Sequence, residues 1–222
     1  MKKQSGFTLV EIAIVLVIIG LLLGGVLKGQ ELINSAKVKN FANDFRNIPL
    51  FIYGYQDKFK AIPGDDKNAD INVGPGTPKG NGDGVINGQW NANTVTESVM
   101  FWQHVRGANL AAGATSLSGV ASGAAVPDLF MPTNAEGGTI GIQGLSAANT
   151  IPIQGLRGTY AICSKNILGK FVKQLDLTVD NGDTATGAML AGTVAAVDAG
   201  NAAPTPTASI DEATTYTVCL GF

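Results

Sequence analysis

The stretch FTLVEIAIVLVIIGLLLGGVL, residues 7–27, decides how this chain is built. It contains a single charge, at Glu11. As a helix that rises about 1.5 Å per residue, it is long enough to cross a hydrocarbon core of about 30 Å. Lys2 and Lys3 precede it and favour a cytoplasmic N-terminus, which leaves everything after Lys28 on the other side of the membrane.

Two simpler interpretations apply to such a stretch. A secretory signal peptide also has a basic start and an apolar region, but this run is long for one and no Ala-x-Ala-like cleavage site follows it. An ordinary signal anchor fits the length and the flanking charges. It does not account for Glu11, and it stays open as an alternative.

Glu11 places a carboxylate inside the apolar run, which costs about 2.5–3.5 kcal/mol at the middle of a membrane. One interpretation is that Glu11 reaches the interface, because it lies one helical turn from Phe7. The other is that it pairs with a cation. If the chain is cut after Gly6, Phe7 gains a free ammonium group, and the Phe7 of a neighbouring subunit can pair with Glu11. That contact would set the stagger between subunits.

The segment Gly6-Phe7-Thr8-Leu9-Val10-Glu11, followed by an unbroken apolar helix, resembles the type IV pilin and pseudopilin family. The resemblance covers about residues 5–35 and departs from many members at Lys28, where they carry proline. It implies that a prepilin peptidase cleaves between Gly6 and Phe7 and N-methylates Phe7. It also implies that Phe7 and Glu11 act in assembly.

The same resemblance implies the location and the partners of the chain. The subunit would wait in the bacterial inner membrane with its head in the periplasm. An inner-membrane assembly platform would then add it to a helical filament with copies of itself or other pilins. The filament would be a cell-surface pilus or a periplasmic pseudopilus, and no specific nucleic acid is expected as a partner.

A second helical pattern continues beyond the apolar run. Its apolar positions are spaced alternately three and four residues apart, which is typical of a helix with one buried face; they are Val38, Phe41, Phe45, Ile48, Ile52, Tyr55 and Phe59. One helix from Phe7 to Phe59 would be roughly 80 Å long, with a bend expected at Pro49. The stripe predicts that a globular head docks on the outer half of this helix. A free amphipathic helix on a membrane would need a lysine-rich polar face instead.

The expected fold is α/β of the α+β, pilin-like kind: a long N-terminal helical spine packed on a small antiparallel sheet with extra short helices. Residues 1–6 form the leader peptide, residues 7–62 the helix, and residues 63–222 the head. Within the head, residues 63–93 are a Gly/Asp-rich loop and residues 94–222 supply the helices and the sheet.

Several elements of the head follow from local signals. Residues 94–97, Thr-Val-Thr-Glu, predict a capping box for a helix over residues 96–106, in which His104 is structural. Ser164 predicts the cap of another helix. Strands are expected at residues 139–143, 150–154, 158–163, 189–197 and 214–220.

Two groups of oxygen-bearing side chains suit Ca²⁺. The first is Asp65, Asp66, Asp70, Asn81, Asp83 and Asn87, and the second is Asp176, Asp180 and Asp183. The run Asn81-Gly82-Asp83-Gly84 is similar to part of a calcium loop, but the EF-hand spacing and its terminal glutamate are missing. Because Asp, Asn and Gly also form turns, a purely structural role is the alternative.

Cys163 and Cys219 are the only cysteines, and both lie in expected strands of the exported part. In an oxidising compartment they should form one disulfide, which would contribute up to about 4 kcal/mol by constraining the unfolded chain. A catalytic thiol is less favoured, because a redox pair is normally spaced as CxxC.

The composition excludes several functional classes. Charged residues make up 14% of the 222 residues and the net charge is −2, which disfavours a dedicated nucleic-acid binder. One histidine and two cysteines are too few for a zinc site of four such ligands within one chain. GxSxG, HExxH, Walker A and dinucleotide motifs are all missing.

The sequence therefore predicts a structural subunit of a type IV pilus or type II secretion-like pseudopilus. It predicts neither an enzyme nor any cofactor beyond Ca²⁺. The alternative is a signal-anchored periplasmic or surface enzyme or adhesion protein that does not polymerise.

Overall fold

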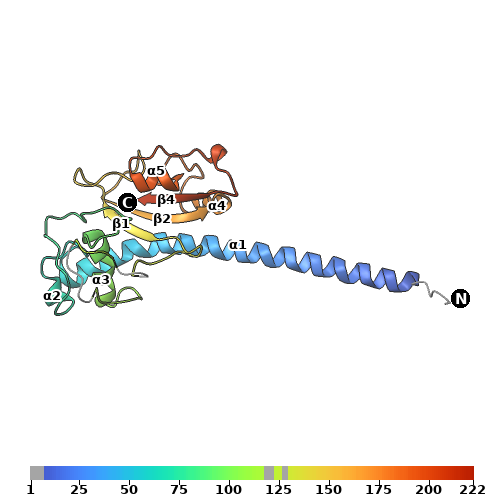
Figure 1. Ribbon diagram of the computed structural model, residues 1–222, viewed down its shortest axis with the longest axis horizontal. Coiled ribbons are helices and arrows are strands. Elements are labelled where there is room, and N and C mark those ends of the chain that lie inside the picture. Colours follow the sequence, from blue (N-terminus) through green and yellow to red (C-terminus); the bar gives the residue numbers. More distant parts are fainter. Residues whose placement is uncertain (1–7, 118–122, 127–129) are drawn as a thin grey trace.

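The computed structural model describes residues 8–117, 123–126 and 130–222. One helix, α1 (Leu9–Phe59), extends far beyond a head that is built on its C-terminal half (Figure 1). The predicted α+β, pilin-like layout of long helix, small antiparallel sheet and short helices is confirmed. The first seven residues, including Gly6 and Phe7, lie outside the described residues.

The two parts of α1 have opposite surroundings. In the apolar segment, residues 9–33, every large apolar side chain is exposed. In the head-bearing segment, residues 38–59, the predicted stripe is buried from Val38 to Tyr55, and only Phe59 at its end is half-buried. The helix is continuous through Pro49 and ends at Phe59, where Lys60 adopts the left-handed conformation with φ of 56°.

Four antiparallel strands of the described residues form the sheet, in the order β1-β2-β4-β3. Their bounds are β1 Ile140–Gly144, β2 Tyr160–Leu168, β3 Met189–Thr193 and β4 Thr215–Gly221. The C-terminal strand, β4, lies inside the sheet between β2 and β3. The chain end is therefore a central part of the head.

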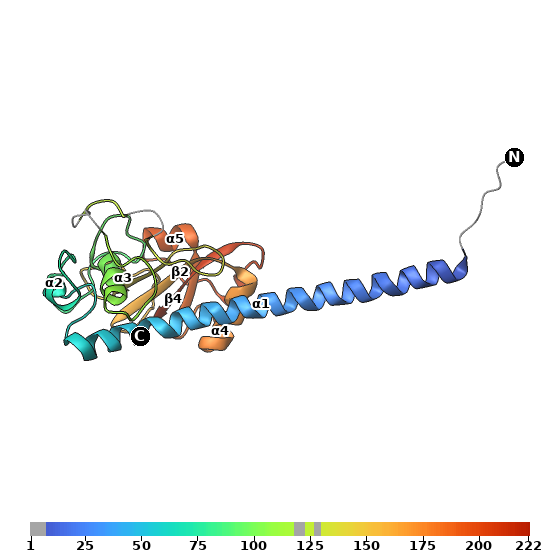
Figure 2. The ribbon, with the colours of Figure 1, turned by 90° about the horizontal axis from the view of Figure 1, so that it is seen from below.

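Helices cover both faces of this sheet. On one face lie the head-bearing segment, α3 (Glu97–Gly107) and α4 (Gly169–Val179), which share one large apolar core with the sheet. On the other face α5 (Val194–Ala199) and a loop that carries Trp90 enclose a smaller core. Figure 2 shows α1 running along one side of the head with α4 beside it. A short helix, α2 (Ala69–Asn72), and a 3-10 turn, Thr207–Ser209, complete the elements.

Three predictions about the C-terminal part of the head are wrong. Ser164 caps no helix: it pairs with Ile140 and Val218 inside β2, and α4 begins only at Gly169 after an irregularity in β2. Cross-strand pairing thus overrides the local capping signal.

Residues 150–154 form no strand. They make one bridge, between Ile153 and Ala202, and Pro152 lacks the N–H that a strand interior requires. The strand expected over residues 189–197 ends at Thr193, after which the alanine-containing α5 begins.

Candidate functional site

The N-terminus of α1 holds Glu11 in a defined hydrogen-bonded arrangement. Both the backbone N–H and the hydroxyl of Thr8 donate to Glu11 Oε2, at 2.8 and 2.7 Å, and Thr8 Oγ1 accepts from the backbone N–H of Glu11. The pair is a capping box, which satisfies donors that the first helical turn leaves free. Sequence reasoning missed this partner within the chain, although the Thr8-x-x-Glu11 spacing signals it.

Glu11 and its neighbours are exposed, so the side chain stays accessible to a partner. The predicted contact with the ammonium group of Phe7 stays a prediction, because Phe7 lies outside the described residues. α1 contains one stretch that is long and apolar enough to cross a membrane, judged by length and composition. A single such helix near an N-terminus is also compatible with a signal sequence.

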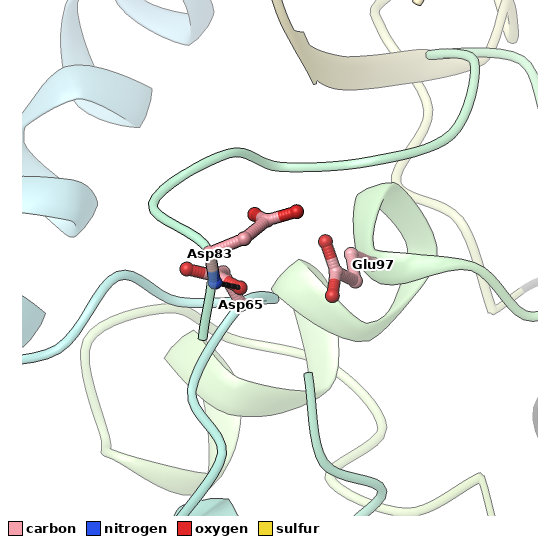
Figure 3. Close-up of side chains that lie close together, drawn as sticks. All are labelled: Asp65, Asp83 and Glu97. Atoms are coloured by element: carbon pink, nitrogen blue, oxygen red, sulfur yellow. Dashed lines mark hydrogen bonds between the residues drawn. The ribbon is translucent and has the colours of Figure 1, made fainter. Parts of the chain in front are cut away.

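An acidic cluster lies at the opposite end of the molecule, where the loop after α1 meets the start of α3 (Figure 3). We define it as Asp65, Asp83 and Glu97, each of which offers one carboxylate oxygen within 4.8 Å of those of the other two. Asp65 and Glu97 are buried, and Asp83 is exposed. The first two residues of this cluster come from the loop, while Glu97 is the first residue of α3.

Backbone geometry explains how the loop wraps around Asp65. Three consecutive N–H groups, from Gly82, Asp83 and Gly84, donate to its carboxylate at 2.6, 3.1 and 2.8 Å. Gly82 and Gly84 have φ values of 77° and 91°, which side chains other than glycine rarely adopt. The Gly-x-Gly pattern therefore serves to turn the N–H groups inward.

Glu97 binds the other side of the same loop. Its carboxylate accepts from the backbone N–H groups of Asn81 and Asn87, at 2.8 and 2.9 Å. This contradicts the predicted capping box at residues 94–97, because the N-cap of α3 is Thr96 and the Glu97 side chain points to the loop instead. Burial raises the pKa of Glu97, and the charge of Asp65 acts in the same direction.

Asp83 differs from its two neighbours in being exposed and surrounded by hydrogen-bond donors. Val85 N–H and the side-chain amides of Asn87 and Asn81 donate to it. These hydrogen bonds favour the ionised form and lower the pKa of Asp83. The cluster thus places three carboxylates, the ligand type that Ca²⁺ prefers, around one point. Calcium binding here stays a prediction.

The structure changes the membership of the predicted first calcium group. Asp66 lies apart and accepts hydrogen bonds from Tyr55 Oη, Asn68 N–H and Asn72 Nδ2. It therefore fixes the loop to the last turns of α1. Asp70 pairs with Lys79 at 3.2 Å. Glu97 belongs to the acidic cluster but is missing from the group predicted from the sequence. Its carboxylate reaches the loop because of where α3 packs, which the sequence does not reveal.

The second predicted calcium group is not gathered into one site. Among the described residues, only the acidic cluster brings three carboxylates within 4.8 Å. Asp180 accepts from the N–H groups of Ala188 and Met189, and Asp183 accepts from the N–H of Ala185 and the hydroxyl of Thr186. Asp176 is buried, and neither of its carboxylate oxygens has a hydrogen-bond partner among the described residues. Burial raises its pKa to about 6.

The two cysteines form the predicted disulfide. Cys163 of β2 and Cys219 of β4 are directly opposite each other in the sheet, with Cα atoms 4.1 Å apart. Both are buried on the face that carries Trp90 and α5. The bond therefore joins two central strands of the head.

His104 lies buried in α3 with both ring nitrogens engaged. Nδ1 accepts from the N–H of Gly64 at 2.9 Å, and Nε2 lies 2.8 Å from the carbonyl oxygen of Pro78. Burial lowers its pKa, which favours the neutral ring. His104 thus connects α3 to the start and the middle of the loop, which accords with the structural role expected for it.

Comparison with known proteins identifies the N-terminal segment. Residues 1–27 match the family model of the prokaryotic N-terminal methylation motif. This motif is the hallmark of type IV pilins and pseudopilins, so the resemblance read from the sequence is confirmed there. It is typical of a membrane-anchored precursor and of a structural subunit rather than an enzyme. The comparisons with curated proteins and with solved structures give no match.

Proposed function

We propose that this chain is a structural subunit of a type IV pilus or a type II secretion-like pseudopilus, and that it polymerises through α1. Prepilin peptidase would cleave between Gly6 and Phe7 and methylate Phe7. The head would lie in the periplasm before an inner-membrane platform adds the subunit to a filament.

One observation carries this proposal: the methylation motif opens a helix whose apolar segment is left uncovered by the described part of its own chain. Large apolar side chains stay exposed from Leu9 to Ile33, and a soluble monomer rarely exposes so large an apolar surface. A membrane can cover the segment before assembly, and the same segments of neighbouring copies can cover it afterwards. The head needs none of this surface, because its own core is closed by the head-bearing segment.

The first test is the intact mass of protein sheared from the cell surface, with and without reductant. A chain that begins at methylated Phe7 and gains two hydrogens on reduction supports processing, the disulfide and assembly together. A chain that still begins at Met1 and stays in membranes overturns the proposal and favours the signal-anchored alternative.

The second test separates the two roles that Glu11 can have. We expect Glu11→Ala to keep membrane insertion and cleavage but to lower filament yield at least tenfold, because the partner of the Phe7 ammonium group is lost. Thr8→Ala removes the capping box while keeping the carboxylate, so it should assemble nearly as well as the parent. Glu31→Ala is the matched control, since Glu31 is exposed on the same helix and pairs only locally with Lys28. Normal filament yield from Glu11→Ala would show that the pairing is wrong.

A further inference from the structure

The side of the head-bearing segment opposite its buried stripe carries an ordered pattern, in which Arg46 also reaches α4 and donates to the carbonyl oxygen of Thr178. Its exposed residues are spaced alternately three and four apart, so they form one stripe along the helix; they are Ala36, Lys39, Asn43, Arg46, Leu50 and Tyr53. We call this stripe the outer face. Leu50 and Tyr53 are 61% and 60% exposed, although both lie beside a well-packed core.

The outer face is continuous with the apolar segment. The same spacing runs back from Ala36 through Leu32, Gly29 and Gly25, and the two glycines have open space where a side chain would stand. Small residues at such positions let two helices approach closely. The exposed surface of the apolar segment therefore continues along the outer face of the head-bearing segment.

Beside the outer face, α1 and α3 enclose a small pocket that contains an unpaired carboxylate. Asp44, Asn47 and Phe51 of α1 line it together with Trp102 and Arg106 of α3, around a volume of about 150 Å³. The Arg106 guanidinium donates hydrogen bonds to the carbonyl oxygens of Ala112, Ala114 and Phe130 rather than to Asp44. Within the described part of the chain, the Asp44 carboxylate has neither an ion pair nor a hydrogen bond, and burial raises its pKa to about 6.

The stripe also carries an exposed cation without a partner. Lys39 takes part in no ion pair among the described residues, whereas Lys37, two residues before it, pairs with Glu136 of the head. At about 100° per residue, Lys39 and Asp44 lie on different sides of α1, about 140° apart. They cannot meet within one chain without breaking the helix. When parallel copies lie side by side, however, Lys39 of one copy can contact Asp44 of its neighbour.

The axial spacing of these two residues fits the stagger predicted at the N-terminus. A contact between Phe7 of one copy and Glu11 of the next shifts parallel helices by four residues, or about 6 Å. Lys39 and Asp44 are five residues apart, or about 7.5 Å, and the length of a lysine side chain covers the difference. One shift therefore satisfies both contacts.

We propose, on the basis of the function proposed above, that the outer face of α1 in one copy packs against the side of α1 that carries Asp44 in a second copy of this chain. Lys39 of the first copy then pairs with Asp44 of the second. Because the two residues lie on different sides of the helix, the contact is heterologous: it joins different surfaces of the two copies. A pair of copies therefore keeps a free Lys39 on one copy and a free Asp44 on the other. Such a contact repeats into a helical filament rather than closing as a dimer.

Charge reversal tests the pairing in the full-length chain. We expect Lys39→Asp and Asp44→Lys each to lower the yield of sheared filaments at least tenfold, because like charges then meet at the contact. The double variant should restore the yield to within about threefold of the parent. Reversal of the pair Asp70 and Lys79, in the distal loop, is the matched control and should leave the yield unchanged.

Cross-linking tests the contact without relying on yield. The native cysteines are joined to each other and none is free, so Lys39→Cys and Asp44→Cys chains, produced together, report only on this contact. Oxidation of their mixed filaments should give a dimer that neither chain gives alone. If the parent forms filaments while charge reversal is harmless and no dimer appears, the pairing is wrong and the proposed function stands. If the parent forms no filaments, the proposed function itself fails.

Discussion

The two halves of α1 belong to one helix but are stabilised in different ways. The head-bearing segment gains its stability inside the chain, because its apolar stripe is buried against α3, α4 and the sheet. The apolar segment is almost uniformly apolar and buries none of its large side chains. An apolar stripe on one side of a helix therefore specifies a partner within the chain, whereas apolar residues on all sides specify surroundings that the chain does not supply.

The largest effect is expected from truncating one large side chain in each half of α1. Phe45→Ala should lower the free energy of unfolding of the head by about 3–5 kcal/mol, because Phe45 is fully buried. Leu22→Ala should change it by less than about 0.5 kcal/mol. Urea unfolding in detergent, followed through the buried Trp90 and Trp102, measures both. Equal effects of the two substitutions would contradict the division of α1.

The disulfide provides the second test, because it lies wholly in the head. Replacing Cys163 and Cys219 together by alanine should cost about 2–4 kcal/mol of head stability. The helical circular dichroism of the apolar segment should persist after the head has unfolded. Treating the parent with reductant is the control and should reproduce the loss. A simultaneous loss of all helical signal would show that the halves are not independent.

Asp176 gives a pH-dependent test on α4, the helix that packs on the head-bearing segment. Its pKa of about 6 in the folded state lies above the ordinary value of 3.8. The folded state therefore holds this proton more tightly than the unfolded state, and the associated stability is lost as the pH rises from about 4 through 6. Asp176→Asn should match the parent at pH 4 and exceed it by about 1–3 kcal/mol above pH 7. A constant difference across this range would contradict the assignment.

The smallest effect is expected at the acidic cluster, just beyond the end of the head-bearing segment. If Ca²⁺ binds there, the melting temperature of the head should rise by about 2–4 °C for each kcal/mol that binding contributes, and EDTA should reverse the rise. Glu97→Gln should abolish the response. Asp70→Asn should keep it, because Asp70 pairs with Lys79 outside the cluster. Identical melting in Ca²⁺ and in EDTA would show that the cluster is only a structural turn.

Much of the fold was predictable because its signals are local. The extent of α1, its buried stripe, α3 and the disulfide partners all follow from spacing, composition and cysteine count. The failures have two causes. The strands expected at residues 150–154 and 189–197 fail for local reasons, namely Pro152 and the alanine-containing α5, whereas the predicted caps fail through competition from distant parts of the chain. Ser164 and Glu97 both carry strong capping signals. Ser164 instead pairs within the sheet, and the Glu97 carboxylate instead accepts hydrogen bonds from N–H groups of the loop.

The parts of this protein that meet a membrane or a neighbour can be recognised from residue order alone. The cost of placing apolar groups in water and the period of a helix are properties of the residues alone, so residues 7–27 and the stripe after them could be interpreted without a structure. Which side chains share a site depends instead on how distant segments pack together. The meeting of Asp65 with Glu97, the central place of β4, and the isolation of Asp44 within the described chain all depend on contacts between segments far apart in the sequence, which no local pattern encodes.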